Sequence, residues 1–138
     1  MPRLKKGPKR HAKPTEEPGT ISFGPLPGYL GYQIRQAQAA VFRDLMASIA
    51  DLEVTPGEYS LLTMLDENPG ISQVDLVAVY HLDKSTLSLA VGRLVKRGLV
   101  RRMRSRDDER YYALWLEQPG RALLQRVRAR VEAQERTM

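Results

Sequence analysis

The segment from Ile71 to Leu116 constrains the fold most strongly, because it contains two short capped helices followed directly by a hairpin. Ser72 and Asp83 stand at the starts of these helices, where a short polar side chain accepts a hydrogen bond from a free amide of the first turn. Gly98 ends the second helix, because glycine readily adopts the left-handed conformation that closes a helix. Two short runs that can each form a strand follow it.

Within the two helices, apolar residues recur every three or four positions, which places them on one buried face. The first helix is expected to bury Leu76 and Val79. The second is expected to bury one stripe and to expose the opposite face. Its predicted buried stripe consists of Leu87, Val91, Leu94 and Val95.

Longer helices flank this segment. Apolar residues spaced by three or four from Tyr29 to about Leu52 predict a long amphipathic helix, and a last helix is expected from about Gln118 to the end. The sequence TPGE at residues 55–58 is a capping box with proline at the first helical position, and it opens a helix that ends at residues 68–70. The predicted fold class is therefore mostly α with a small β-hairpin wing, which is the layout of a winged helix-turn-helix.

The outer helices, residues 29–52 and 118–138, carry apolar stripes longer than a small core can cover. Leaving such stripes in water costs about 25 cal/mol per Å², so we expect these helices to form a homodimer. The chain divides into a basic flexible tail, residues 1–28, and a regulator domain, residues 29–138. Residues 53–117 of that domain form the predicted DNA-binding lobe.

Length and composition favour one soluble globular domain, since 42% of the 138 residues are hydrophobic and 28% are charged. No apolar run approaches the roughly 20 residues that cross a bilayer, so we expect a cytoplasmic protein without a membrane partner. The lack of cysteine excludes disulfides, and two distant histidines do not predict a metal site. Because no nucleophile–base pair or phosphate-binding loop is recognisable, we expect neither an enzyme nor a cofactor.

Positive charge is concentrated in one internal block. Residues 84–110 contain nine Lys and Arg against three acidic residues, a net charge of +6, whereas residues 29–83 have a net charge of −6. The tail, residues 1–28, adds a net charge of +4. A basic block of this density is typical of a phosphate-binding surface, although a charged face can also serve only to prevent aggregation.

Together these features resemble the MarR family of bacterial winged-helix transcription regulators. The resemblance rests on DKST at residues 83–86, on the run 93–100 that leads into the wing, and on DER at 108–110 with Gly120 ten residues on. It implies a homodimer formed by the outer helices, with each recognition helix in a major groove. It also implies wing arginines in or near minor grooves and a small ligand that releases the operator.

The exposed face of helix 84–96 and the tip of the wing are the predicted DNA contacts. Short hydroxyl side chains permit close approach to a groove, and arginine can bind guanine through two hydrogen bonds. The predicted DNA-binding residues are Lys84, Ser85, Thr86, Ser88, Leu89, Arg93, Lys96, Arg104 and Arg106. An ordinary polar helix surface is the alternative, and Leu89 is either an isolated exposed leucine or a contact to a thymine methyl group.

Asp108 and Arg110 are predicted to hold the wing in shape by pairing with each other or with nearby backbone, and direct DNA contact is their alternative role. Arg101 and Arg102 can reach phosphates from the first strand. Since successive side chains of a strand point to opposite faces, one of these two must face away from DNA.

The family resemblance also implies an effector pocket, surrounded by the helices where the dimer-forming and DNA-binding parts meet. Tyr32, Arg35, Arg43 and Tyr59 lie on those helices and are the candidate effector-binding residues. Arg35 and Arg43 are the only cations between residues 29 and 83, so an anionic effector such as an aromatic carboxylate or its thioester would meet them first. Core or dimer packing is the alternative role for each residue.

The sequence therefore predicts a ligand-responsive transcription regulator, a repressor that binds a pseudo-palindromic operator in double-stranded DNA and is released by a small organic effector. The alternative is a winged-helix subunit that binds protein within a larger assembly. In that case the outward face of helix 84–96 should be more apolar and less basic than it is.

Overall fold

The computed structural model describes three stretches of the chain, residues 21–80, 83–104 and 111–138. The structure consists of two units, which join in sequence between Arg35 and Gln36. The N-terminal unit contains the 3-10 helix η1, Leu26–Gly28. There the side-chain amide of Gln33 donates a 2.9 Å hydrogen bond to the carbonyl oxygen of Pro27.

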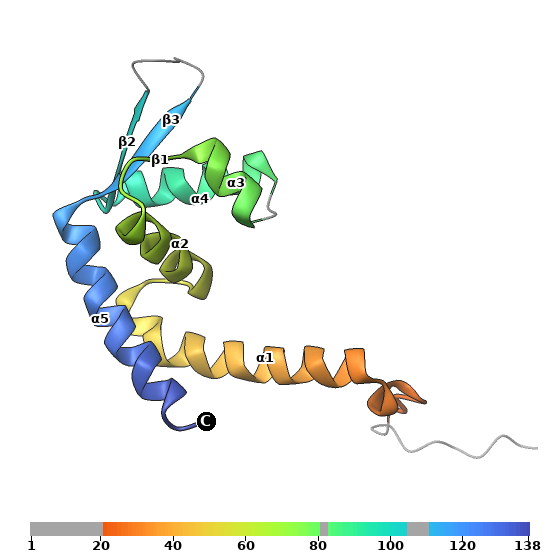
Figure 1. Cartoon of the computed structure of the whole chain (residues 1–138). Helices are drawn as coiled ribbons and strands as arrows, with labels where there is room; N and C mark the ends of the chain where they lie inside the picture. Colours follow the sequence, from red (N-terminus) through yellow and green to blue (C-terminus); the bar gives the residue numbers. More distant parts are fainter. Residues whose placement is uncertain (1–20, 81–82, 105–110) are drawn as a thin grey trace, which may run out of the picture. The chain divides into compact units, whose positions relative to one another are not determined.

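The α-helices and the two strands of the hairpin follow in the predicted order (Figure 1). They are α1 (Leu30–Ile49), η2 (Ala50–Leu52), α2 (Pro56–Glu67), β1 (Ile71–Ser72), α3 (Gln73–Tyr80), α4 (Lys84–Lys96), β2 (Val100–Arg104), β3 (Tyr112–Leu116) and α5 (Gln118–Glu135). This order confirms the predicted class, a mostly α fold with a small β-hairpin wing.

The predicted helix starts are confirmed by their hydrogen bonds. Thr55 accepts from the amide of Glu58 at 3.1 Å while the Glu58 carboxylate accepts from the amide of Thr55, which completes the capping box of α2. The Ser72 hydroxyl accepts from the amide of Asp75 at 3.1 Å at the start of α3. Asp83 caps α4. These local contacts set where α2, α3 and α4 begin.

The hairpin belongs to a three-stranded antiparallel sheet with the order β1-β3-β2. Strand β1 was not predicted, because two residues are too short to show alternation. It pairs Ile71 with Leu114, and the amide of Gly70 donates to the carbonyl oxygen of Leu114 at 2.8 Å. This pairing ties the turn between α2 and α3 to the base of the wing.

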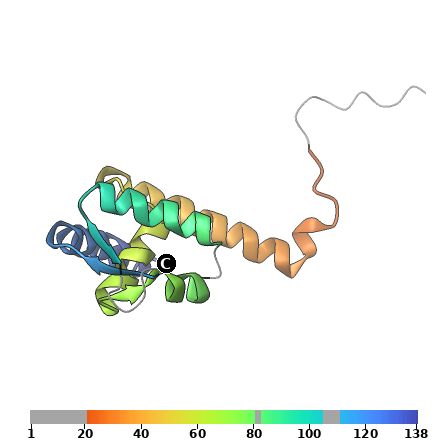
Figure 2. The same ribbon diagram turned by 90° about the horizontal axis from the view of Figure 1, so that it is seen from above.

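One apolar core joins the helix-turn-helix to the sheet. Helix α3 packs against α4, as Figures 1 and 2 show from two directions. The core consists of Leu61, Leu62, Leu65, Leu76, Leu87, Val91, Leu94, Leu99, Val100, Leu114, Leu116 and Leu124. A smaller cluster, Ile49, Leu52, Val54 and Val127, packs the end of α1 against α5. The predicted stripe of α4 is buried at Leu87, Val91 and Leu94, and Val95 is half-buried.

The prediction for the inward face of α3 was wrong at one position. Leu76 is fully buried, but Val79 is 57% exposed. The buried face instead includes Gln73, with Val77 and Tyr80 packed against the core. Residues 73, 76, 77 and 80 share one side of the helix at spacings of three and four, so polar Gln73 occupies a place that the apolar pattern alone could not reveal.

The start of α5 passes very close to the chain that enters β2. The amide of Glu117 donates to the carbonyl oxygen of Leu99 at 2.9 Å, and buried Gly120 lies against the same carbonyl. A Cβ atom at residue 120 would collide with the Leu99 carbonyl oxygen and would lie 2.8 Å from Cδ1 of Leu116. Only glycine therefore lets α5 pack at this distance from the wing.

We predict that Gly120→Ala lowers the free energy of unfolding by about 1–3 kcal/mol, because rigid backbone rather than a flexible side chain meets the new methyl group. Gly92→Ala is the matched control. Residue 92 lies within α4, and a Cβ atom there would meet no other part of the protein within 4 Å. Because alanine favours a helix over glycine, this variant should raise the free energy of unfolding by roughly 0.5–1 kcal/mol. Urea unfolding of both variants measures this difference, and equal midpoints would contradict the close approach.

Candidate nucleic-acid interface

The exposed side of α4 gathers most of the predicted DNA-binding residues. Because Leu87, Val91 and Leu94 are buried on the opposite side, the helix cannot rotate without exposing its core stripe. The exposed residues are Lys84, Ser85, Thr86, Leu89, Arg93 and Lys96. Ser88 is half-buried at the edge of this face. The structure thus brings all seven onto one accessible side of one helix, with Leu89 67% exposed.

The cap of α4 uses part of this face. Both the amide and the hydroxyl group of Thr86 donate to the Asp83 carboxylate, each at 2.7 Å. These hydrogen bonds hold the pKa of Asp83 below its usual range, and the bond from the Thr86 hydroxyl group has the largest effect. The hydroxyl proton of Thr86 therefore serves the cap, and its lone pairs and methyl group remain for a partner.

Arg93 lies beside the N-terminal turn of α2. Its Nε atom is 3.8 Å from a carboxylate oxygen of Glu58, the same residue that completes the capping box. The Arg93 side chain is 64% exposed, whereas that of Glu58 is only 11% exposed. A contact of this length with an exposed arginine is weak, so the guanidinium can leave it for a stronger partner.

The wing contributes Arg104 from the end of β2. Arg104 is exposed, and its guanidinium carbon lies 5.7 Å from the centre of the Tyr112 ring. The predicted contact Arg106 and the predicted wing-shaping residues Asp108 and Arg110 lie outside the described residues. Their roles stay predictions.

Two neighbouring arginines of β2 point to opposite faces of the sheet, as strand geometry requires. Arg101 lies over Trp115 at 4.9 Å and 3.3 Å from the carboxylate of Glu117. Arg102 donates from Nη2 to the carbonyl oxygen of Ser88 in α4 at 3.2 Å and lies 5.5 Å from the Tyr112 ring centre. Arg102 therefore ties the wing to α4.

This role of Arg102 was not predicted from sequence. Strand alternation separates Arg101 from Arg102, but the carbonyl partner lies 14 residues away in another element. The partner becomes visible only once the sheet and α4 are packed together.

The candidate effector residues fall in both units. Tyr32 is half-buried beside Phe23 in the N-terminal unit, where Arg35 is exposed. In the C-terminal unit the Arg43 side chain is 76% exposed and lies 4.0 Å from Asp44, and Tyr59 packs against both apolar clusters. Packing is thus an observed role of Tyr59, and effector binding stays a prediction for all four.

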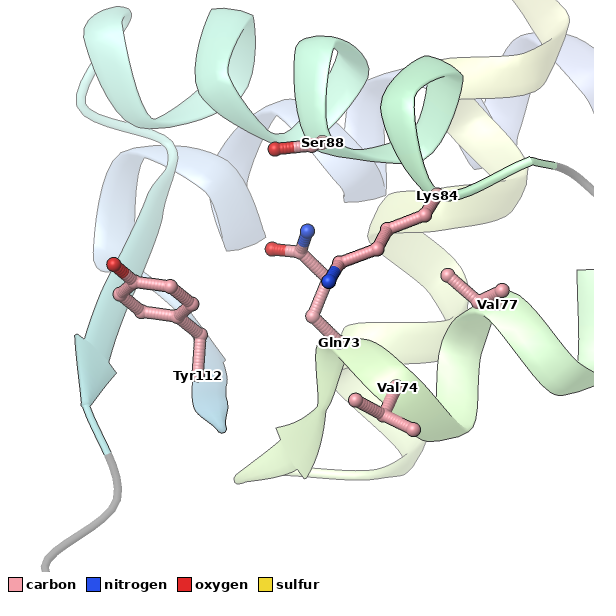
Figure 3. A pocket seen from close by; sticks show the side chains of 6 residues that line it. All are labelled: Gln73, Val74, Val77, Lys84, Ser88 and Tyr112. Atoms are coloured by element: carbon pink, nitrogen blue, oxygen red, sulfur yellow. The ribbon is translucent and has the colours of Figure 1, made fainter. Parts of the chain in front are cut away.

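Sequence reasoning also missed a pocket of about 330 Å³ between the start of α3, the start of α4 and β3 (Figure 3).

No group of three or more His, Asp or Glu in the described residues is placed to hold a metal ion. Nor does any helix of those residues combine the length and apolar character that crossing a bilayer requires.

Comparison with known proteins supports the same fold. Residues 54–112 match the sequence profile of the MarR family. A putative transcriptional regulatory protein for the hcr operon of Thauera aromatica is 34% identical over 129 residues, which cover 92% of this chain and 78% of that protein. The solved structure of the transcriptional repressor CouR bound to a 23-mer DNA duplex is similar with a TM-score of 0.76 and 33% identity, covering 83% of this chain and 80% of that one. CouR bound to p-coumaroyl-CoA gives a TM-score of 0.74 and 32% identity, covering 82% and 78%.

We predict that Arg102→Ala weakens binding to duplex DNA about fivefold more than Arg101→Ala does. Each change removes one positive charge, but only Arg102 holds the wing against α4, and one hydrogen bond contributes about 1 kcal/mol. Titration of both variants with the same labelled duplex gives the ratio. Equal losses would show that general charge, and not the position of the wing, sets the affinity.

Proposed function

Because the chain belongs to the MarR family of transcription regulators, we propose that it is a homodimeric DNA-binding repressor whose operator is released by a small organic effector. The observation that carries this proposal is the exposed face of α4, where Lys84, Arg93 and Lys96 surround short hydroxyl side chains on a firmly buried helix. A bacterial DNA-binding regulator of this kind would act in the cytoplasm.

In the proposed complex, α4 enters a major groove, where base edges present distinct hydrogen-bonding patterns. Arg93 and Ser85 are the candidates for reading bases, because both are exposed and Arg93 is only loosely held. Lys84 and Lys96 are suited to phosphates, since an ammonium group acts as a point charge. Arg104 and Arg106 contact the backbone or a minor groove from the wing, and Asp108 with Arg110 keeps its shape.

The proposed dimer rests mainly on α1. In the C-terminal unit this helix exposes Val41, Phe42 and Met46, with exposed fractions of 36%, 44% and 52%. The apolar stripe of α5 packs within the same chain, since Leu124 is buried in the larger apolar cluster and Val127 in the smaller one. A second copy that covers the α1 surface would create a two-fold axis, and the operator would then be an imperfect palindrome with half-sites about 10 bp apart.

The proposed effector is an organic anion, an aromatic acid or its thioester. The similar repressor CouR has been solved with p-coumaroyl-CoA, which supports this class. Tyr32, Arg35, Arg43 and Tyr59 are the proposed contacts, because they combine aromatic surface with the cations of an otherwise acidic stretch.

The alternative function, a winged-helix subunit that binds protein, fits the reading face less well. The core of a protein–protein interface is depleted of charged residues such as lysine, and Leu89 is the only large apolar residue on the exposed face of α4. The exposed side of α4 also carries three cations, namely Lys84, Arg93 and Lys96. This charge favours a polyanion as the partner.

We predict that affinity for duplex DNA falls roughly 10³- to 10⁵-fold between 50 and 200 mM salt, as expected if a dimer neutralises about six to ten phosphates. Fluorescence anisotropy with a duplex enriched from a random library measures this slope. A protein partner bound by the same face through apolar contacts would give a nearly flat response. A flat response with DNA would contradict the electrostatic basis of the proposal.

A further inference from the structure

One arginine joins the C-terminal end of α4 to the end of α1. Arg97 directly follows α4, and its Nη1 atom donates to the main-chain carbonyl oxygen of Glu53 at 2.7 Å. The two residues lie 44 positions apart in the sequence. Residues 48–54 form the junction between α1 and α2. Among the described residues, this contact is the only hydrogen bond or ion pair that joins residues 84–97 to the junction.

The carbonyl that accepts from Arg97 has a well-defined position. Glu53 adopts left-handed backbone angles, φ 54° and ψ 42°, and its amide donates to the carbonyl oxygen of Ala50 at 3.2 Å. Its two neighbours, Leu52 and Val54, are buried in the smaller apolar cluster. A backbone oxygen held in this way does not move with a side-chain rotamer. It therefore positions Arg97 more exactly than an exposed carboxylate could.

A second arginine holds the same junction from α5. Both terminal nitrogens of Arg130 donate to the carboxylate of Asp51 at 3.0 Å, and Nη1 also donates to the carbonyl oxygen of Ser48 at 2.9 Å. The Ser48 carbonyl belongs to the last turn of α1, where carbonyl groups lack partners within the helix. Figure 1 shows α5 beside this end of α1. The end of α1 is thus held by α5 on one side and by Arg97 on the other.

Arg97 is poorly placed to read bases itself. It lies at the C-terminal end of α4, roughly 20 Å along the helix axis from Lys84. A recognition helix contacts base edges mainly with its N-terminal residues. What separates Arg97 from the other cations of α4 is therefore its contact with the junction.

We propose that Arg97 is a positioning residue that sets the separation of the two copies of α4 in the dimer, and thereby the half-site spacing that the dimer accepts. This role rests on the proposed function, a DNA-binding dimer formed through Val41, Phe42 and Met46 of α1. In such a dimer the two-fold axis passes beside α1. The distance between the two copies of α4 then depends on how each α4 is held relative to its own α1, and Arg97 holds it at the junction.

The binding test compares three duplexes. One is the duplex enriched with the wild-type chain, and the others have one base pair added or removed midway between its half-sites. Each change shifts one half-site by about 3.4 Å and turns it by roughly 34° about the duplex axis. Wild type should prefer the enriched spacing by roughly 30-fold or more, because a displaced half-site loses its base contacts. Arg97→Met should reduce this preference about tenfold, as expected for loss of a hydrogen bond from a charged group.

Two control variants separate position from charge. Lys96→Met removes the neighbouring positive charge, which has no hydrogen bond or ion pair with the junction in the described structure, so it should weaken binding to all three duplexes by the same factor. Glu53→Gln removes a carboxylate but keeps the carbonyl that accepts from Arg97, so its spacing preference should equal that of wild type. The positioning role is overturned if Arg97→Met weakens all three duplexes alike, or if Lys96→Met lowers the spacing preference as much as Arg97→Met does.

A second measurement needs no DNA. Because the chain contains no cysteine, Leu89→Cys provides a single site for a spin label on the exposed side of α4. Double electron–electron resonance then measures the distance between the two labels of the free dimer. We expect a narrow distribution in this background and a broader one when Arg97→Met is added, whereas Lys96→Met should leave the width unchanged.

Failure of DNA binding and failure of the positioning role give different results. If the protein bound no duplex, the proposed function would fail, and a broader distribution with Arg97→Met would still support the positioning role. Equally narrow distributions with and without Arg97→Met would overturn that role even if the protein binds DNA. A monomer in light scattering would overturn both the proposed dimer and the role of Arg97 in it.

Discussion

Burial of one stripe of α4 is the constraint on which the rest of the site depends. Leu87, Val91 and Leu94 are almost completely removed from water, and turning the helix would expose them at a cost of roughly 1.5–3 kcal/mol each. The polar side of α4 is therefore presented outward as a consequence of packing. If this face contacts DNA as proposed, it can do so without a free-energy cost for ordering the helix.

Two contacts carry this orientation to the wing. Gly120 lets α5 lie against the Leu99 carbonyl at the base of β2, and Arg102 joins β2 to the backbone of α4. The two-residue strand β1 adds a third connection through its pairing with Leu114. Helix and wing are thus fixed to one core, so the described basic residues of α4 and β2 keep defined positions relative to one another.

Features with local causes could be predicted from the sequence. The caps at Thr55, Ser72 and Asp83 depend on residues three positions apart, and the apolar stripe of α4 depends on helical spacing. Contacts between elements could not be predicted this way. Strand β1, the exposure of Val79, the burial of Gln73 and its pocket depend on how α3 meets the sheet, and no local pattern encodes that.

DNA reading by the outward face of α4 is tested most directly by mapping amide chemical shifts along the chain during titration with an enriched duplex. We predict the largest changes on the exposed side of residues 84–96, with further changes at Arg104 and in the wing. Changes confined to the basic segment of residues 1–28, with α4 unaltered, would contradict it and would assign DNA binding to the N-terminal tail.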